Sequence, residues 1–218
     1  MGRALGLSAV VQSPLLPPGR PVRRVGQLLV GLVLYGVSDA MVVMAGLGVE
    51  PWDALAQGLS RAVGLSIGIW TNLIGAAVLL LWIPLKQKAG LGTLCNVLLV
   101  GTSMDVTLAF APAPNTLWLR WVLLISGIVL NGFATGCYIG AQVGPGPRDG
   151  LMTGLASRGY PLWAVRWGIE LIVLAIGFLL SATVGIGTLL YACSIGPLAH
   201  LFIPMLEMKA PELPHRTT

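Results

Sequence analysis

Charged residues are scarce in this sequence: only 10% of its 218 positions are Asp, Glu, Lys or Arg. Soluble domains average about 25%, so an ordinary soluble domain is excluded. Cysteine is also rare, and Cys95, Cys137 and Cys193 all lie in apolar segments without C-x-x-C spacing. We expect buried, inert thiols rather than a redox or metal centre.

Signatures of common enzymes are missing as well. The chain contains no H-E-x-x-H, no G-x-S-x-G and no Walker lysine, and it has only two histidines. These motifs mark zinc proteases, α/β-hydrolases and nucleotide-binding loops. We therefore expect no enzymatic activity, no cofactor and no bound metal.

Hydrophobic residues, in contrast, make up 56% of the chain. They form runs of about 20 residues, the length that crosses a bilayer as a helix. The fold class predicted is an all-α membrane protein with about six transmembrane helices. The candidate spans are residues 26–46, 67–85, 91–111, 118–141, 163–183 and 185–206. Only a short glycine turn separates the last two, so five spans stay an alternative.

The basic residues predict an orientation. With the N-terminus inside, eleven of the 13 Lys and Arg residues fall in cytoplasmic segments, and only Arg61 and Arg120 fall outside. Such a bias is typical of bacterial inner-membrane proteins, so both termini are expected in the cytoplasm. Because the basic residues occupy short loops between spans, nucleic acid is not an expected partner. Residues 1–25 and 207–218 are expected to be cytoplasmic tails, the first of them disordered.

A nine-residue element, P-x-D-x-L-x-x-G-L, occurs twice, at residues 51–59 and 147–155. Around it, residues 31–59 match 127–155 at eleven positions, at a constant shift of 96. We interpret residues 26–111 and 118–206 as two repeats of three spans each. Because three is odd, the second copy must enter the membrane upside down, which gives the inverted repeat common in secondary transporters.

Each copy of the element is predicted to begin a short helix that lies at the interface or re-enters the membrane. Proline suits the first helical turn, and an acidic residue suits the positive helix N-terminus. The first copy would face outside and the second the cytoplasm. The positions assigned a structural role are Pro51, Gly58, Pro147 and Gly154, together with Gly92, Thr93, Gly187 and Thr188 of two G-x-G-T turns that begin helices.

Acidic residues are the candidates for a solute or ion pathway. Asp53 and Asp149 of the duplicated element either cap their helices or line a polar pathway at its two ends. Ionisable residues at membrane depth usually face a cavity or a partner. The other candidates are Asp39, Asp105, Glu170 and His200, the last of which occupies the position in the second repeat that Asp105 holds in the first. Glu170 follows Arg166 by four residues, so an ion pair along one helix is an alternative role for it.

The combination of G-x-x-P-x-D-x-L-x-x-G-L, the turn K-x-G-x-G-T at 88–93 and the closing G-I-G-T-L-L-Y-A-C-S-I-G-P-L resembles the YczE/YyaS/YitT-like family of bacterial integral membrane proteins. The similarity covers about residues 25–206. It implies a bacterial cytoplasmic-membrane protein of about six spans and carries no defined activity.

Two functions from different classes fit the sequence. The first is a small secondary transporter or permease, expected to form a homo-oligomer, in which the duplicated element acts as a gate for a small solute or ion. The alternative is a membrane scaffold that does not transport and that assists assembly or secretion of a partner system. In both cases the lipid bilayer is the surrounding partner.

Overall fold

In the computed structural model, residues 20–112 and 114–208 are described, and this part of the chain folds into eight α-helices without a β-strand. Six of them are long and apolar enough to cross a membrane. They are α2 (Pro21–Ala45), α4 (Ile67–Leu85), α5 (Leu91–Phe110), α6 (Leu117–Gly140), α8 (Leu162–Leu179) and α9 (Ile186–Leu206).

The predicted all-α class and the six long apolar helices are confirmed. The boundaries differ by more than one residue at two places: α2 already begins at Pro21, where proline occupies the first helical turn, and α8 ends at Leu179 rather than near 183. The bend at Ser181, which has a φ of 67°, separates α8 from α9. Most of the two predicted tails, residues 1–19 and 209–218, lies outside the described residues.

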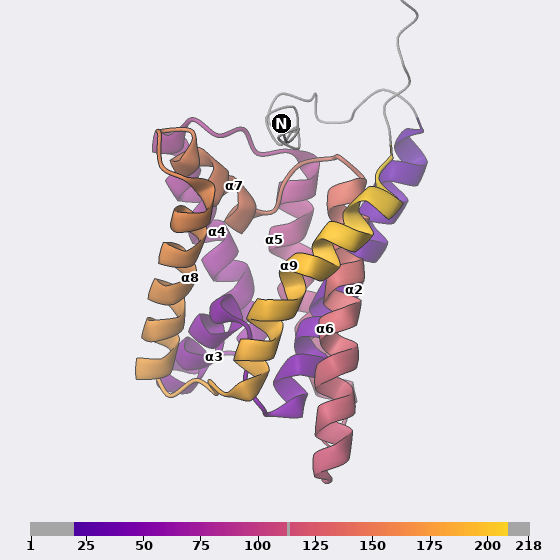
Figure 1. Ribbon diagram of the computed structural model, residues 1–218, viewed down its shortest axis with the longest axis vertical. Helices are drawn as coiled ribbons and strands as arrows, with labels where there is room; N and C mark the ends of the chain where they lie inside the picture. The colour runs from indigo at the N-terminus through magenta and orange to yellow at the C-terminus, as the bar shows by residue number, and fades with distance from the viewer. Residues whose placement is uncertain (1–19, 113, 209–218) are drawn as a thin grey trace, which may run out of the picture.

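The two copies of the duplicated element form two short helices. These are α3 (Pro51–Val63) and α7 (Pro147–Ala156), with 13 and 10 residues. Both begin with proline and carry an aspartate in the first turn. At 1.5 Å per residue neither is long enough to cross a bilayer of about 30 Å. Figure 1 shows α3 toward one end of the molecule and α7 toward the other.

Helices α2 and α6 cross along one side of the molecule (Figure 1), and the other helices pack in pairs that match between the halves. Helix α5 packs on α2 and α9 on α6, while α8 packs on α3 and α4 on α7. Glycines allow close approach at the crossing. A Cβ on Gly31 would lie 2.8 Å from the Cys137 side chain, and one on Gly127 would lie 3.0 Å from Val42. Small residues at such positions are what lets membrane helices pack closely.

The loop that precedes α3 contacts the start of α9, and the loop that precedes α7 contacts the start of α5. The backbone N–H of Gly187 donates to the Leu47 carbonyl (2.8 Å), and that of Gly92 donates to Val143 (3.1 Å). Within the G-x-G-T turn of the first repeat, Thr93 Oγ1 accepts from the Gly90 N–H (3.2 Å). This contact satisfies one of the free donors at a helix N-terminus. The turns therefore hold the chain that leads into α3 and α7.

Candidate functional site

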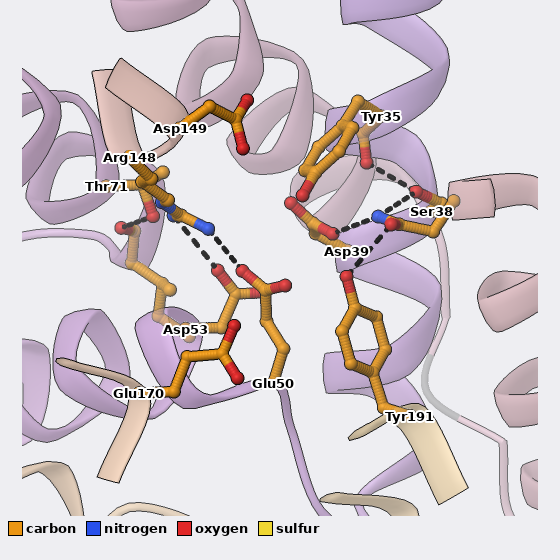
Figure 2. A network of polar contacts seen from close by, with 12 residues as sticks. Tyr35, Ser38, Asp39, Glu50, Asp53, Thr71, Arg148, Asp149, Glu170 and Tyr191 are labelled. Atoms are coloured by element: carbon orange, nitrogen blue, oxygen red, sulfur yellow. Dashed lines mark hydrogen bonds and ion pairs between the residues drawn. The ribbon is translucent and has the colours of Figure 1, made fainter. Parts of the chain in front are cut away.

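Three acidic side chains meet inside the bundle. Asp39 comes from the middle of α2, Glu50 is the residue before α3, and Asp53 lies in the first turn of α3. Each offers a carboxylate oxygen within 4.8 Å of the other two. The residues are 1%, 4% and 0% exposed, respectively, so water does not solvate the cluster from bulk. Figure 2 shows the three side chains pointing toward one another.

Arg148, from the first turn of α7, is the basic residue of this site. Its guanidinium forms an ion pair with Glu50, and its Nη2 lies 3.9 Å from Asp53 Oδ1. The guanidinium carbon also lies 5.1 Å from the centre of the Trp52 ring, within the range of a cation–π contact. The first turns of α3 and α7 therefore meet in the interior.

This meeting corrects one interpretation of the sequence. The two copies of the element were expected on opposite faces, with Asp53 and Asp149 either capping their helices or lining a polar pathway at its two ends. Instead the helices begin at a common centre, and only their C-terminal ends point to opposite ends of the molecule (Figure 1). Arg148 bridges them because Glu50 and Asp53 offer charges that it can neutralise in a dry environment.

The charges of the site do not balance. Burial first, and then the neighbouring Glu50 carboxylate, raise the pKa of Asp53 well above its usual value, while Arg148 opposes the shift. Burial alone would lower the pKa of Arg148, but Glu50 and other acidic groups raise it, so the guanidinium stays charged. Three carboxylates then share one arginine in a region where an unpaired charge costs several kcal/mol.

Asp39 is held in place by a chain of hydrogen bonds between helices. Asn131 Nδ2 on α6 donates to Asp39 Oδ1 (2.8 Å) and to Ser38 Oγ (3.0 Å). Tyr191 on α9 donates its hydroxyl proton to Asn131 Oδ1 (2.9 Å). Within the described chain, Asp39 Oδ2 and both oxygens of Asp53 accept no hydrogen bond. The network therefore orients Asp39 with one free oxygen, as Figure 2 shows.

Asp149 lies in a different environment, beside a small cavity of about 50 Å³. Its Oδ2 accepts a hydrogen bond from the Tyr138 hydroxyl (2.8 Å). Tyr35 packs edge-on against the Tyr138 ring, with ring centres 5.9 Å apart. Arg148 also lines this cavity, and its side chain is 19% exposed. The cavity is wide enough for one or two water molecules and reaches the charged centre.

The remaining predicted residues do not join the cluster through any described contact. Asp105 accepts hydrogen bonds from Ser66 Oγ and from the Gly68 N–H (2.8 Å), and so caps the start of α4. His200, at the position in the second repeat that Asp105 holds in the first, is exposed on α9. Glu170 accepts a hydrogen bond from Arg166 Nε (2.9 Å), the predicted ion pair along one helix.

Sequence reasoning missed Glu50 and assigned Arg148 only to topology. Both occupy positions at which the two copies of the element differ: Gly146 stands opposite Glu50, and Trp52 stands opposite Arg148. A comparison restricted to matching positions passes over them. A charged residue in one repeat, at a position where the other repeat has an uncharged residue, is the sequence signal that could have identified them.

Comparisons with known proteins agree on one family. The chain matches the family of unknown function DUF6198 over residues 22–204. It is 38% identical over 189 residues to an uncharacterized protein of Haemophilus influenzae, with 86% of each chain covered. It is 32% identical over 178 residues to the uncharacterized membrane protein YczE of Bacillus subtilis, covering 80% of this chain and 82% of that protein.

A further relative is the uncharacterized protein YyaS of Bacillus subtilis, which is 30% identical over 187 residues, with 82% of this chain and 91% of YyaS covered. No solved structure matches the chain. The resemblance to YczE and YyaS found in the motifs is confirmed, and the six apolar helices agree with a membrane protein. The chain therefore belongs to DUF6198, a YczE/YyaS-like family of bacterial membrane proteins.

Proposed function

We propose that the protein is a small secondary transporter that binds its cargo where the first turns of α3 and α7 meet. The observation that supports this most directly is the ion pair between Arg148 and Glu50, which joins two short helices inside a bundle of long apolar ones. Ionisable groups at such depth are costly and usually mark a solute or ion pathway.

The helix geometry suits this role. Broken helices whose N-termini point to the middle of the membrane place positive backbone dipoles around a binding site. Here both N-termini are present, together with Arg148 and the carboxylates of Asp53 and Asp149. Such a centre can bind a small polar or zwitterionic solute from both sides.

We further propose that the two halves form an inverted repeat with both termini in the cytoplasm of a bacterial inner membrane. A difference between the halves supports a cycle with two states. Asp105 and Asn72 tie α4 to α5, where Asn72 Oδ1 accepts from the Gly101 N–H (3.0 Å). In the second half, a Cβ on Gly196 of α9 would meet nothing within 4 Å. The contact of α5 with α4 at Gly101 is closed, and the space beside the equivalent Gly196 on α9 is open. Alternating access uses such a difference between the two halves.

Transient currents from proteoliposomes on a solid-supported membrane test the transporter proposal. A panel of small amino acids, organic acids, amines, Na⁺ and protons is applied by rapid exchange. We expect at least one solute to give a current that falls about tenfold or more in Glu50→Gln and in Asp149→Asn, because each loses a charge-assisted contact. His200→Ala, at an exposed position, is the matched control and keeps the current.

The alternative function gives the opposite result. If the folded wild-type protein passes no current for any solute of the panel and is purified with a partner protein, the scaffold is favoured. If all variants including the control lose the current equally, the loss reflects folding, and thermal unfolding of the same samples separates the two explanations.

A further inference from the structure

The cluster of Asp39, Glu50 and Asp53 carries an inference beyond transport itself. The three carboxylates come from two helices and a loop, and each presents an oxygen within 4.8 Å of the others. Carboxylate oxygens are the ligands that hard cations prefer, and Ca²⁺ binds them at about 2.3–2.6 Å. One ion of that size can touch oxygens with this spacing. Mg²⁺ needs a tighter shell of about 2.0–2.1 Å.

The charge of the cluster indicates a divalent ion. Arg148 compensates one of the three carboxylates, through its ion pair with Glu50. Two formal negative charges remain on groups that are almost fully buried. A buried charge without compensation is strongly destabilising, so added positive charge, from protons or from a cation, stabilises the site. One divalent cation supplies it without disturbing the arginine.

The second, independent observation is the set of free oxygens. Asp39 Oδ2 and both oxygens of Asp53 have no hydrogen-bond partner among the described residues, although the two residues are 1% and 0% exposed. Buried polar atoms in folded proteins almost always have a partner. Asp39 is not free to seek one, because Asn131 fixes its other oxygen (2.8 Å). Figure 2 shows the carboxyl groups of the three residues gathered in one region, where each offers an oxygen within 4.8 Å of the others.

We propose that Asp39, Glu50 and Asp53 form a binding site for one hard divalent cation, with Ca²⁺ as the best fit. This inference deepens the proposed function, because it places a coupling ion beside the cargo site. Binding itself does not depend on transport. The site can therefore be tested on protein that moves no solute, and its failure is distinguishable from failure of the transporter proposal.

Thermal unfolding of the purified full-length protein in detergent tests the site. CaCl₂, MgCl₂ and NaCl are titrated separately at constant ionic strength, with N-methylglucamine chloride as the balancing salt, at pH 6 and pH 8. A ligand that binds only the folded state raises its stability in a saturable way. At 100 times its dissociation constant, Ca²⁺ is expected to raise the Tm by about 5 °C or more. The effect is larger at pH 8, because protons compete for the same oxygens.

Variants assign the response to the cluster. Asp53→Asn and Asp39→Asn remove one ligand each and are expected to abolish most of the Ca²⁺ shift. Glu207→Gln, which changes a carboxylate that accepts from Gln142 near the end of α9, is the control and keeps the full shift. Terbium luminescence excited through tryptophan and displaced by Ca²⁺ gives a measurement on the wild-type protein alone, should both aspartate variants fail to fold.

Three results would overturn the proposal. One is the absence of any saturable cation effect on the wild-type protein in both measurements. A second is an effect that Asp53→Asn and Glu207→Gln retain equally, which places the ion elsewhere. The third is a response to pH alone that Asp53→Asn removes, which assigns the cluster to protons rather than to a metal ion.

Discussion

At the scale of single residues, the site depends on one arginine. Arg148 compensates a cluster in which negative charge is in excess, so its removal and the removal of Glu50 are not equivalent. Without Arg148, three buried carboxylates lose their compensation. Without Glu50, the arginine keeps Asp53 at 3.9 Å, and the excess of negative charge falls.

We therefore expect an asymmetric effect on stability. Arg148→Gln is expected to cost about 3–5 kcal/mol, the range for breaking a buried ion pair from one side. Glu50→Gln is expected to cost less than half as much, and the double variant less than the sum, because the two residues interact. Thermal unfolding of the wild-type protein, the two single variants and the double variant in N-methylglucamine buffer measures this double-mutant cycle. Equal losses in the two single variants would contradict the charge imbalance.

How much of the site the sequence could predict is clear from individual residues. Asp39 was identifiable because an acid inside an apolar run stands out, and Asp53 because it belongs to the duplicated element. Glu50 and Arg148 were not identifiable, because their role is to pair with each other and they lie 98 positions apart in the chain. Asp105 is the reverse case: its depth suggested a pathway, and the structure adds a local role as a cap, with the Gly68 N–H 2.8 Å from its carboxylate. Local pattern does not reveal which partner a buried charge finds.

At the scale of helices, a glycine contact holds each short helix against a long one. In one half the glycine lies on the short helix, and in the other half it lies on the long helix. On α7, Gly150 makes room for the indole of Trp82 from α4, and that indole donates to the Pro147 carbonyl (3.0 Å). On α3 the same position is Ala54, and the glycine lies on the partner helix α8 as Gly177. Each contact thus has one small and one larger member.

Adding a methyl group should therefore disturb either contact. In Gly150→Ala the new Cβ would overlap the rigid Trp82 ring, and in Gly177→Ala it would overlap the backbone at Ala54. We expect a loss of about 1–3 kcal/mol in each, the usual cost of overpacking. Gly196→Ala on α9 is the control, because nothing lies within 4 Å, and alanine favours a helix. Denaturation in detergent measures all three. A neutral Gly150→Ala would show that α7 is not fixed against α4.

The helices themselves were largely predictable, because length and hydropathy decide which segments can cross a membrane. The starts of α3 and α7 were also readable from Pro51 and Pro147. The meeting of the two helix N-termini in the interior was not predictable, because no local sequence signal gives the depth at which a short helix begins. It follows from Arg148 and Glu50, which pull the two first turns together.

At the scale of the whole molecule, contacts recur between the halves at the 96-residue shift of the sequence. Gly31 faces Cys137 and Tyr138, and Gly127 faces Met41 and Val42, the residues at the equivalent positions. Reciprocity of this kind is what a two-fold axis produces at an interface. It supports the proposed inverted repeat, in which the axis runs through the crossing of α2 and α6, close to the contact of Trp52 with Arg148.

An inverted repeat makes a definite prediction for the free ends of the short helices. Val63 ends α3 and is 68% exposed, and Tyr160 follows α7 and is 62% exposed. The excess of basic residues predicts that the second position faces the cytoplasm. In a Cys193→Ser background, which removes the exposed native thiol, a membrane-impermeant maleimide should label Val63→Cys only from outside. It should label Tyr160→Cys only in inverted vesicles.

Labelling in detergent, where both thiols are accessible, is the control for reactivity, and the background protein without added cysteine gives the baseline. Labelling of both positions from one side would contradict the inverted repeat, because it would place the ends of α3 and α7 on the same face. Labelling of each position from both sides would mean two orientations in the membrane, which the strong bias of basic residues opposes. Opposite labelling, together with a shared centre at Arg148 and Glu50, would leave the cargo site between two access paths, one beside each short helix.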